Sequence, residues 1–282
     1  MHIIQSFKIV VHAALLICLC ALFVEQVSAE DTDATITPGV LTIGSDLTYP
    51  PYLYLDEGKA VGSDPEFMRM IADHLGLEPD IVDTRFAELI VGLRAKRFDV
   101  VASNLYITPE RAEVIDYVPY YETGDSIMVL ADSDFTPRTP RDLCGKSVSN
   151  IKGASWIPKL DKVTEEYCLP HDKGEIEIHE YPTAPEATQA LLSRAVDVQF
   201  ADALIAKLAV EKSDGNLRIT SEELLYPIPV GLGISQGNEA MREALQGAIQ
   251  EMKDSGEYQD WLDKYNLEEP NEEQVRQVLQ EQ

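Results

Sequence analysis

The sequence predicts an α/β fold built from two series of alternating strands and helices. In residues 40–111, short apolar runs alternate with segments of helical spacing in the order βαβαβ, and a second series of this kind occupies residues 147–211. This order is typical of parallel sheets, because each return to a parallel neighbour needs a right-handed crossover, usually a helix. A polar segment with two prolines, residues 132–142, separates the two series. We expect a boundary between two lobes there.

Composition excludes one class of partner. The chain has 282 residues and 45% hydrophobic residues, enough for a globular fold. It carries 49 Asp and Glu against 23 Lys and Arg, a formal net charge of −26. We expect no nucleic-acid binding, since counterion release needs basic side chains on phosphates. The five histidines show no metal-ligand spacing, so we expect no metal. We also expect no cofactor, and we expect the protein to be a monomer.

The first 29 residues predict a secretory signal peptide. Lys8 supplies a short positive region, residues 9–23 are almost entirely apolar, and residues 27–29 form a small-residue cleavage pattern. The apolar run is shorter than the ~20 residues that a membrane-spanning helix needs. We therefore expect cleavage after Ala29 and export to the periplasm.

Two of the four cysteines are expected to form a disulfide. Cys18 and Cys20 leave with the signal peptide, and Cys144 and Cys168 remain. In an oxidising compartment their pairing is the natural expectation, with two free buried thiols as the alternative.

The most informative stretch is residues 86–111. Helical spacing from Phe86 is followed by an apolar strand at 98–102, a short polar loop, and a helix start at Thr108 and Pro109. Open α/β sheets bind ligands where a strand's carboxyl end feeds a helix, and free N–H groups there favour an anion. Arg111 adds a permanently charged, bidentate group. Together these features indicate a carboxylate receptor; alternatively, Arg111 is a solvated first-turn residue.

The remaining elements are assigned in chain order. In the first series we expect strands at 40–46 and 81–82, a helix from 63 that ends at Gly76, and strands at 114–118 and 126–130. In the second series we expect strands at 147–150, 175–181 and 196–200 and helices at 157–167, 184–194 and 203–211. After these we expect a return strand at 226–235, helices at 241–252 and 258–265, and a solvated or frayed tail at 268–282.

These assignments predict a domain organisation. Residues 1–29 are the signal peptide, residues 30–131 begin lobe 1, residues 132–227 form lobe 2, residues 228–267 return to lobe 1, and residues 268–282 are an acidic tail. Two lobes joined by two crossings suggest a ligand held between them by hinge closure.

The chain resembles periplasmic solute-binding proteins of the polar-amino-acid class, the bacterial extracellular solute-binding proteins of family 3. The resemblance covers nearly all of residues 39–267 and rests on GSDLTYPPY, FAELIVGLRAKRFDVVASNLYITPER, CGKSVSNIKGAS, ALLSRAVDVQFAD and YPIPVGLGIS. It implies a type II two-lobed clamshell, each lobe a mainly parallel sheet flanked by helices. It also implies binding without catalysis, with a small zwitterionic ligand and an ABC permease as partners.

The resemblance also implies roles for individual residues. Arg111 would clamp the ligand's α-carboxylate, assisted by backbone N–H groups near Tyr106 and Ser155. Ser103 and Asp202 would hold the α-ammonium. As alternatives, Asp202 could cap the next helix and Ser103 could be an ordinary loop hydroxyl.

Three further residues would complete the site. Phe86 and Tyr49 would pack against the ligand from two sides, and Asp46 would point toward its variable side chain. The alternatives are plain core aromatics and a turn carboxylate. With Asp46 and the acidic composition, a polar or cationic amino acid is favoured.

Three positions depart from the family pattern. Tyr106 stands where a small Ser or Thr is usual, Asn104 replaces a usual Ser or Gly, and Trp156 replaces a small or amide residue. A more aromatic pocket would favour a cation, a methylated amine or a flat ring through cation–π contact.

Two other ligand or activity classes stay open. An ectoine-, betaine- or opine-like solute would suit an aromatic pocket. A cyclohexadienyl (prephenate or arogenate) dehydratase on the same fold would need a general acid in the cleft, and the sequence singles none out.

Overall fold

The computed structural model describes residues 35–280, and its main sheet has nine strands within that range. The strand order is β5-β1-β6-β12-β7-β10-β8-β9, with β11 pairing with β7; β2, β3 and β4 form a separate antiparallel sheet. The expected signal peptide, its cleavage site at Ala29, and Cys18 and Cys20 lie outside the described residues.

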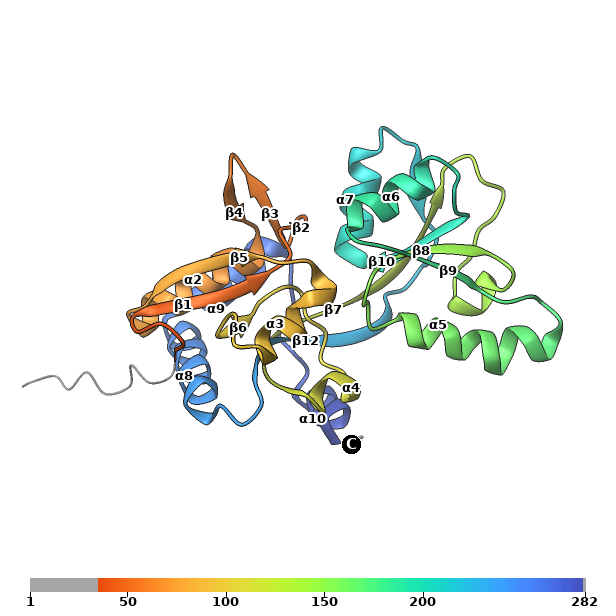
Figure 1. Ribbon diagram of the computed structural model, residues 1–282. Helices are drawn as coiled ribbons and strands as arrows, with labels where there is room; N and C mark the ends of the chain where they lie inside the picture. Colours follow the sequence, from red (N-terminus) through yellow and green to blue (C-terminus); the bar gives the residue numbers. More distant parts are fainter. Residues whose placement is uncertain (1–34, 281–282) are drawn as a thin grey trace, which may run out of the picture. The chain divides into compact units, whose positions relative to one another are not determined.

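The first lobe is defined by β1, β5, β6 and the elements packed on them (Figure 1). Strand β1 pairs in parallel with β5 on one side and β6 on the other. The strands are β1 (Val40–Ser45), β2 (Thr48–Tyr49), β3 (Leu53–Asp56), β4 (Lys59–Val61), β5 (Glu78–Asp83) and β6 (Val100–Val101). The helices are α2 (Ser63–Leu75), η2 (Phe86–Glu88), α3 (Leu89–Arg94), α4 (Pro109–Ala112), α8 (Glu239–Ser255), α9 (Glu257–Tyr265) and α10 (Glu272–Gln280).

The second lobe is defined by β8, β9, β10 and their helices. Strand β8 pairs in parallel with both β9 and β10, and Figure 1 shows α5, α6 and α7 around these strands. The strands are β8 (Ser147–Ile151), β9 (Glu177–Tyr181), β10 (Val198–Asp202) and β11 (Leu217–Ile219). The helical segments are η3 (Pro140–Leu143), α5 (Ile157–Val163), η4 (Thr164–Cys168), η5 (Leu169–His171), α6 (Ala184–Leu192) and α7 (Ala203–Lys212).

Two long antiparallel strands, β7 (Ile115–Leu130) and β12 (Leu225–Ser235), connect the lobes. The prediction of two separate strands at 114–118 and 126–130 was wrong, because β7 runs unbroken through Pro119. Proline lacks a donor and is tolerated in a ladder mainly at edges and bulges. Here Pro119 faces Gly231, where the register between β7 and β12 shifts. The irregularity therefore lets one strand span both lobes.

Local capping signals were read correctly at two helices. The hydroxyl of Thr108 accepts the backbone N–H of Arg111 at 3.3 Å, and Pro109 opens α4. Gly76 ends α2 in the left-handed region, with φ 64°. The predicted helix at 157–167 was too long, because regular α geometry ends at Val163 and a wider turn follows.

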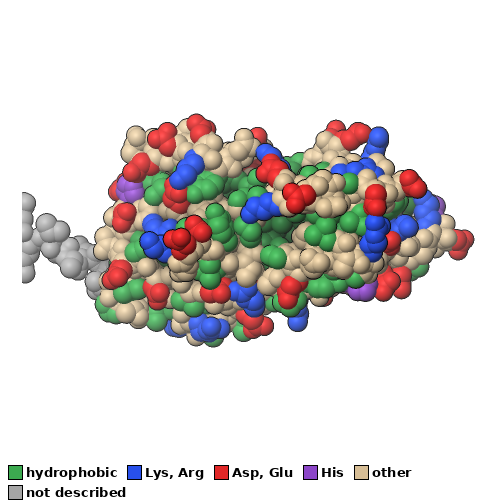
Figure 2. Space-filling model, turned by 90° about the horizontal axis from the view of Figure 1, so that it is seen from above, with side chains coloured by type: hydrophobic (Ala, Val, Ile, Leu, Met, Phe, Trp, Pro, Cys, Tyr) green, Lys and Arg blue, Asp and Glu red, His purple; other side chains and the backbone are tan. Residues whose placement is uncertain are grey.

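Residues Glu272–Gln280 of the acidic tail form α10, which touches the rest of the chain. Gln274 on α10 donates to the carbonyl of Pro227, and Val278 packs against the small cluster that contains Leu89 and Phe98. On the face shown in Figure 2, acidic and basic side chains are interspersed around exposed apolar ones. In the described part of the chain, no helix combines the length and the apolar character needed to cross a membrane.

The expected disulfide between Cys144 and Cys168 is confirmed. It ties the chain just after η3 to the last residue of η4, and Cys168 is buried in the main core. The bridge closes a loop whose ends are 24 residues apart in sequence. A cross-link of this span restricts the unfolded chain and so stabilises the folded state.

We expect the double variant Cys144→Ser/Cys168→Ser to lose about 3.5 kcal/mol of unfolding free energy, the loop-closure value for this span. Urea unfolding measures it, and the reduced parent protein should behave like the variant. An unchanged unfolding midpoint in both would contradict the stabilising role.

Candidate functional site

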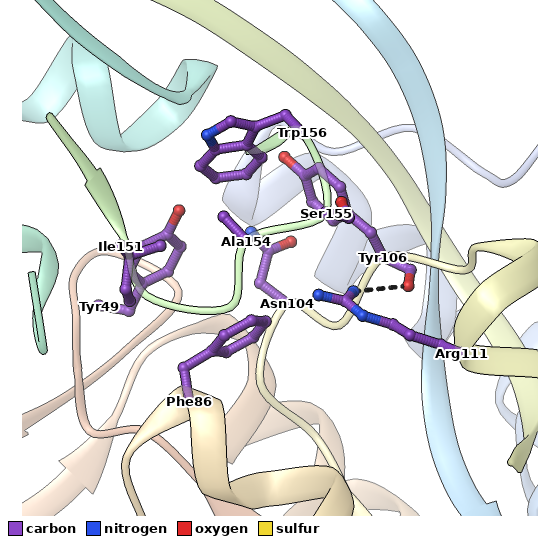
Figure 3. Close-up of a pocket in the computed structure, with 9 residues that line it drawn as sticks. All are labelled: Tyr49, Phe86, Asn104, Tyr106, Arg111, Ile151, Ala154, Ser155 and Trp156. Carbon is purple, nitrogen blue, oxygen red and sulfur yellow. Dashed lines mark hydrogen bonds between the residues drawn. The ribbon is translucent and has the colours of Figure 1, made fainter. Parts of the chain in front are cut away.

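A cavity with about 270 Å³ of space, counting the part that is open to solvent, lies where the first lobe meets the second (Figure 3). The first lobe supplies Tyr49, Phe86, Asn104, Tyr106 and Arg111, and the second supplies Ile151, Ala154, Ser155 and Trp156. Strands β6 and β8 both end at this cavity, as expected for a site at the carboxyl edge of parallel strands.

Arg111 is the charged residue of the cavity lining. Its Nη1 donates to the carbonyl of Tyr106 at 2.9 Å, and its Nη2 donates to the carbonyl of Gly153 at 3.0 Å. The guanidinium also lies 5.4 Å from the centre of the Phe86 ring. A guanidinium carries five N–H groups, so donors remain for a ligand.

The charge of Arg111 has no acidic partner in residues 35–280. Arg85 and Arg242 pair with carboxylates, whereas no described carboxylate forms an ion pair with Arg111. Burial lowers the pKa of Arg111, but an arginine stays protonated in proteins. Helix α4 has only four residues, so the guanidinium, rather than the helix dipole, makes this site attractive to an anion.

Asp202 lies behind the cavity wall and is fully buried. It ends β10, and its Oδ1 accepts the backbone N–H of Leu204, so the carboxylate caps α7. Four side chains add further donors. They are Tyr52 on Oδ1 at 2.9 Å and, on Oδ2, Tyr106 at 2.7 Å, Thr123 at 3.0 Å and Asn104 at 3.2 Å.

A second buried carboxylate, Asp125, faces Asp202 across the β7–β10 ladder. The hydroxyl of Tyr106 lies 3.2 Å from Asp125 Oδ1. Burial and the charge of Asp202 raise the pKa of Asp125 well above its ordinary value. Burial raises the pKa of Asp202 too, but the hydrogen bonds of its four side-chain donors oppose that rise. Because Asp202 has the larger set of donors, we assign the negative charge to Asp202 and a proton to Asp125.

Asp46 and Ser103 lie next to the cavity but do not line it. Asp46 pairs with Arg85 at 2.9 Å and accepts the backbone N–H of Phe86 at 2.8 Å. The hydroxyl of Ser103 accepts the backbone N–H of Asp46 at 3.0 Å. In this arrangement both polar groups hold the segment that positions Phe86.

The aromatic positions predicted from the sequence gather around the cavity. Trp156 donates from Nε1 to Asn150 at 2.6 Å, which fixes its indole, and its ring centre lies 5.8 Å from that of Tyr106. Figure 3 shows these rings together with those of Tyr49 and Phe86 around the same space.

Sequence reasoning missed several contributors. Ile151 and Ala154 line the cavity, and Gly153 supplies a carbonyl to Arg111. These residues lie at or just after the carboxyl end of β8, as Asn104 and Tyr106 lie after the carboxyl end of β6. That equivalent position in the second series of strands is the signal that could have identified them. Tyr52 and Thr123, the other donors to Asp202, belong to distant segments, and no local pattern marks them.

Comparison with known proteins decides the family. The model of the bacterial extracellular solute-binding proteins, family 3, matches residues 41–268. The chain belongs to this family. The resemblance seen in the sequence and its two-lobed α/β fold are thereby confirmed, and the family's members are receptors for small solutes.

Named relatives of this family 3 protein bind different amino acids. The L-cystine-binding protein TcyJ of Escherichia coli (strain K12) is 30% identical over 229 residues, covering 80% of this chain and 82% of that protein. The arginine-binding protein ArgT of Corynebacterium glutamicum is 26% identical, covering 87% and 80%. The structure of an ancestral arginine-binding protein bound to arginine is 30% identical, with a TM-score of 0.74, covering 80% and 98%.

One buried acid next to the cavity has a strongly shifted pKa. Asp64, in the first turn of α2, accepts the backbone N–H of Asn104 at 2.7 Å. Asn104 has φ 46°, a left-handed conformation that Asn tolerates better than most residues. Burial raises the pKa of Asp64 from 3.8 to about 7, although the Asn104 N–H opposes the shift.

This shift predicts a pH dependence of stability. Between pH 3.8 and about pH 7 the folded state binds the Asp64 proton whereas the unfolded state does not. The contribution of this proton to the unfolding free energy is therefore complete below pH 3.8 and is lost as the pH rises to about 7. Relative to Asp64→Asn, the parent protein should lose about 4 kcal/mol of unfolding free energy between pH 4 and pH 8. Urea unfolding across this range tests it. Asp73→Asn, at an exposed site on α2, should follow the parent protein; parallel curves for the parent and Asp64→Asn would refute the shift.

Proposed function

We propose that this chain is an extracytoplasmic receptor of an ABC importer that holds an amino acid or amino-acid-like carboxylate between its two lobes. One observation carries the proposal: Arg111 lines the cavity, and no carboxylate among the described residues 35–280 forms an ion pair with it. An anionic group of the ligand would supply the missing charge. Membership of family 3 supports the same function.

The carboxylate would bind the free N–H groups of Arg111. Charge-assisted hydrogen bonds contribute about 1.5–3 kcal/mol each, and a guanidinium can make two to one carboxylate. The rest of the ligand would pack on Tyr49, Phe86 and Trp156, which line the same space. A polar or cationic side chain suits this mixed lining, and the relatives' ligands do not single out one compound.

The two long strands support a hinge for this receptor. Strand β7 pairs with β12 from Ile115 to Thr123 and again at Asp125, and it pairs with β10 from Asp125 to Met128. At the same level β12 shifts register between Leu225 and Ile228, and Tyr226 has φ 49°. We therefore place the change of lobe at these residues, inside the strands and close to the proposed boundaries at 132 and 228.

Closure would bring both lobes around the ligand, and the joined surface would dock on the transmembrane subunits of the importer. We place the protein in the periplasm as a monomer, after cleavage at Ala29. Docking of a closed receptor would couple ligand binding to transport without any covalent step.

The dehydratase alternative receives less support. Catalysis on a bound ring would need a general acid within hydrogen-bond reach. The nine residues that line the cavity include no Asp, Glu or His. Glu165, Glu166 and Glu186 are exposed and lie away from the lining. The geometry favours binding alone.

Removing the guanidinium should weaken ligand binding strongly. We expect Arg111→Ala to weaken binding of a carboxylate ligand by about 2–5 kcal/mol, the usual cost of losing one partner of a buried charge pair. The measurement is isothermal titration, with thermal unfolding as a screen, on protein refolded from denaturant to strip bound ligand. A ligand at about 100 times its Kd should stabilise the parent protein by about 2.7 kcal/mol.

The matched control is Arg94→Ala, at an exposed arginine in the last turn of α3. It should bind like the parent protein. Equal affinity of Arg111→Ala and Arg94→Ala for the same carboxylate would remove the proposed clamp. Absence of binding by any amino acid or related carboxylate would overturn the receptor itself.

A further inference from the structure

We propose that this receptor selects carboxylates whose nitrogen is quaternary, carrying no N–H, over primary α-amino acids. Tyr106 covers Asp202, the acid expected to hold an α-ammonium, and leaves an aromatic wall in its place. The inference rests on the proposed function in one respect, namely that Arg111 binds the ligand's carboxylate.

The carboxylate of Asp202 has no capacity left for a ligand. A carboxylate offers about four lone-pair sites, and five donors already point at this one. An incoming ammonium would have to displace one of them. The displaced group would then be left buried and without a partner, which is unfavourable.

Access to Asp202 is closed as well. The residue has no exposed surface and is absent from the cavity lining. Tyr106 does line the cavity, and the hydrogen bond from its hydroxyl to Asp202, at 2.7 Å, is the shortest of the five that Asp202 accepts. The same hydroxyl lies 3.2 Å from Asp125, so both buried acids stand behind this one side chain.

What the ligand meets instead is a set of aromatic rings. The guanidinium of Arg111 lies over Phe86, and Tyr49, Tyr106 and Trp156 complete an aromatic lining that faces the rest of the ligand (Figure 3). A primary ammonium needs hydrogen-bond acceptors, whereas a quaternary ammonium is held by the negative faces of aromatic rings.

The test compares matched pairs of ligands by isothermal titration of the refolded protein. The pairs are glycine with N,N,N-trimethylglycine and proline with N,N-dimethylproline, and arginine, histidine and cystine are titrated in parallel. We expect the methylated member of a pair to bind at least about tenfold more tightly. Tighter binding of the primary amino acids would overturn the selectivity and leave the receptor function standing. No binding by any of these carboxylates would overturn both.

Variants at Tyr106 locate the cause of the selectivity. Tyr106→Ser removes the ring and uncovers Asp202, so the preference should shift by at least about tenfold toward the primary amine. Tyr52→Phe is the matched control, because it also removes a hydroxyl from Asp202 but leaves the cavity lining intact. It should keep the preference of the parent protein. An unchanged preference in a folded Tyr106→Ser variant would refute the role of Tyr106.

A second variant covers the case in which Tyr106→Ser does not fold. Tyr106→Phe keeps the ring over Asp202 and removes only the hydroxyl. We expect it to retain the preference for the methylated ligand, whereas a preference for the primary amine would show that the ring does not set selectivity. Cooperative thermal unfolding confirms that each variant is folded before titration.

Discussion

The buried carboxylate of Asp202 organises the region between the lobes. A charge removed from water is costly unless hydrogen bonds replace its hydration. Asp202 therefore depends on donors from both lobes: Tyr52, Asn104 and Tyr106 come from the first, and Leu204 lies on its own helix. Loss of any one of them would leave the charge less compensated. The loop after β6 and the segment after β2 are thus positioned by the same acid that caps α7.

The two charged groups of the site, Asp202 and Arg111, have opposite surroundings. Asp202 is saturated with donors and covered, whereas the contacts of the Arg111 guanidinium in residues 35–280 are the carbonyls of Tyr106 and Gly153 and the ring of Phe86, none of them an anion. Carbonyl dipoles orient a guanidinium but do not cancel its charge. In a chain with a formal net charge of −26, this cavity is a local positive site, and its low-dielectric surroundings strengthen that charge toward a ligand. The asymmetry favours an anionic group at Arg111 and gives no comparable place for a cation at Asp202.

The sequence was informative wherever the cause was local. Thr108 and Gly76 mark helix ends through their own chemistry, so both caps were predicted correctly. The unbroken β7 was missed, because tolerance of Pro119 depends on a register shift against a strand more than 100 residues away. The hydrogen-bond donors around Asp202 could not be predicted for the same reason, because they come from segments that are distant in the sequence. The unusual aromatic at Tyr106 was visible in the sequence, but its bond to Asp202 depends on the tertiary fold.

The closed arrangement of the two lobes is stabilised by a ligand only through the contacts that this ligand adds. A ligand shifts a conformational equilibrium only by its difference in affinity for the two states. In the part of the chain that the structure describes, hydrogen bonds already join the lobes without a ligand: Tyr52, Asn104 and Tyr106 reach Asp202, and Arg111 reaches Gly153. An ammonium that displaced Tyr106 would exchange one of these bonds for another and so gain little for closure. A ligand that leaves Tyr106 in place adds its contacts with Arg111 and Trp156 to those already made. The second kind of ligand is therefore the more effective one at holding the two lobes together.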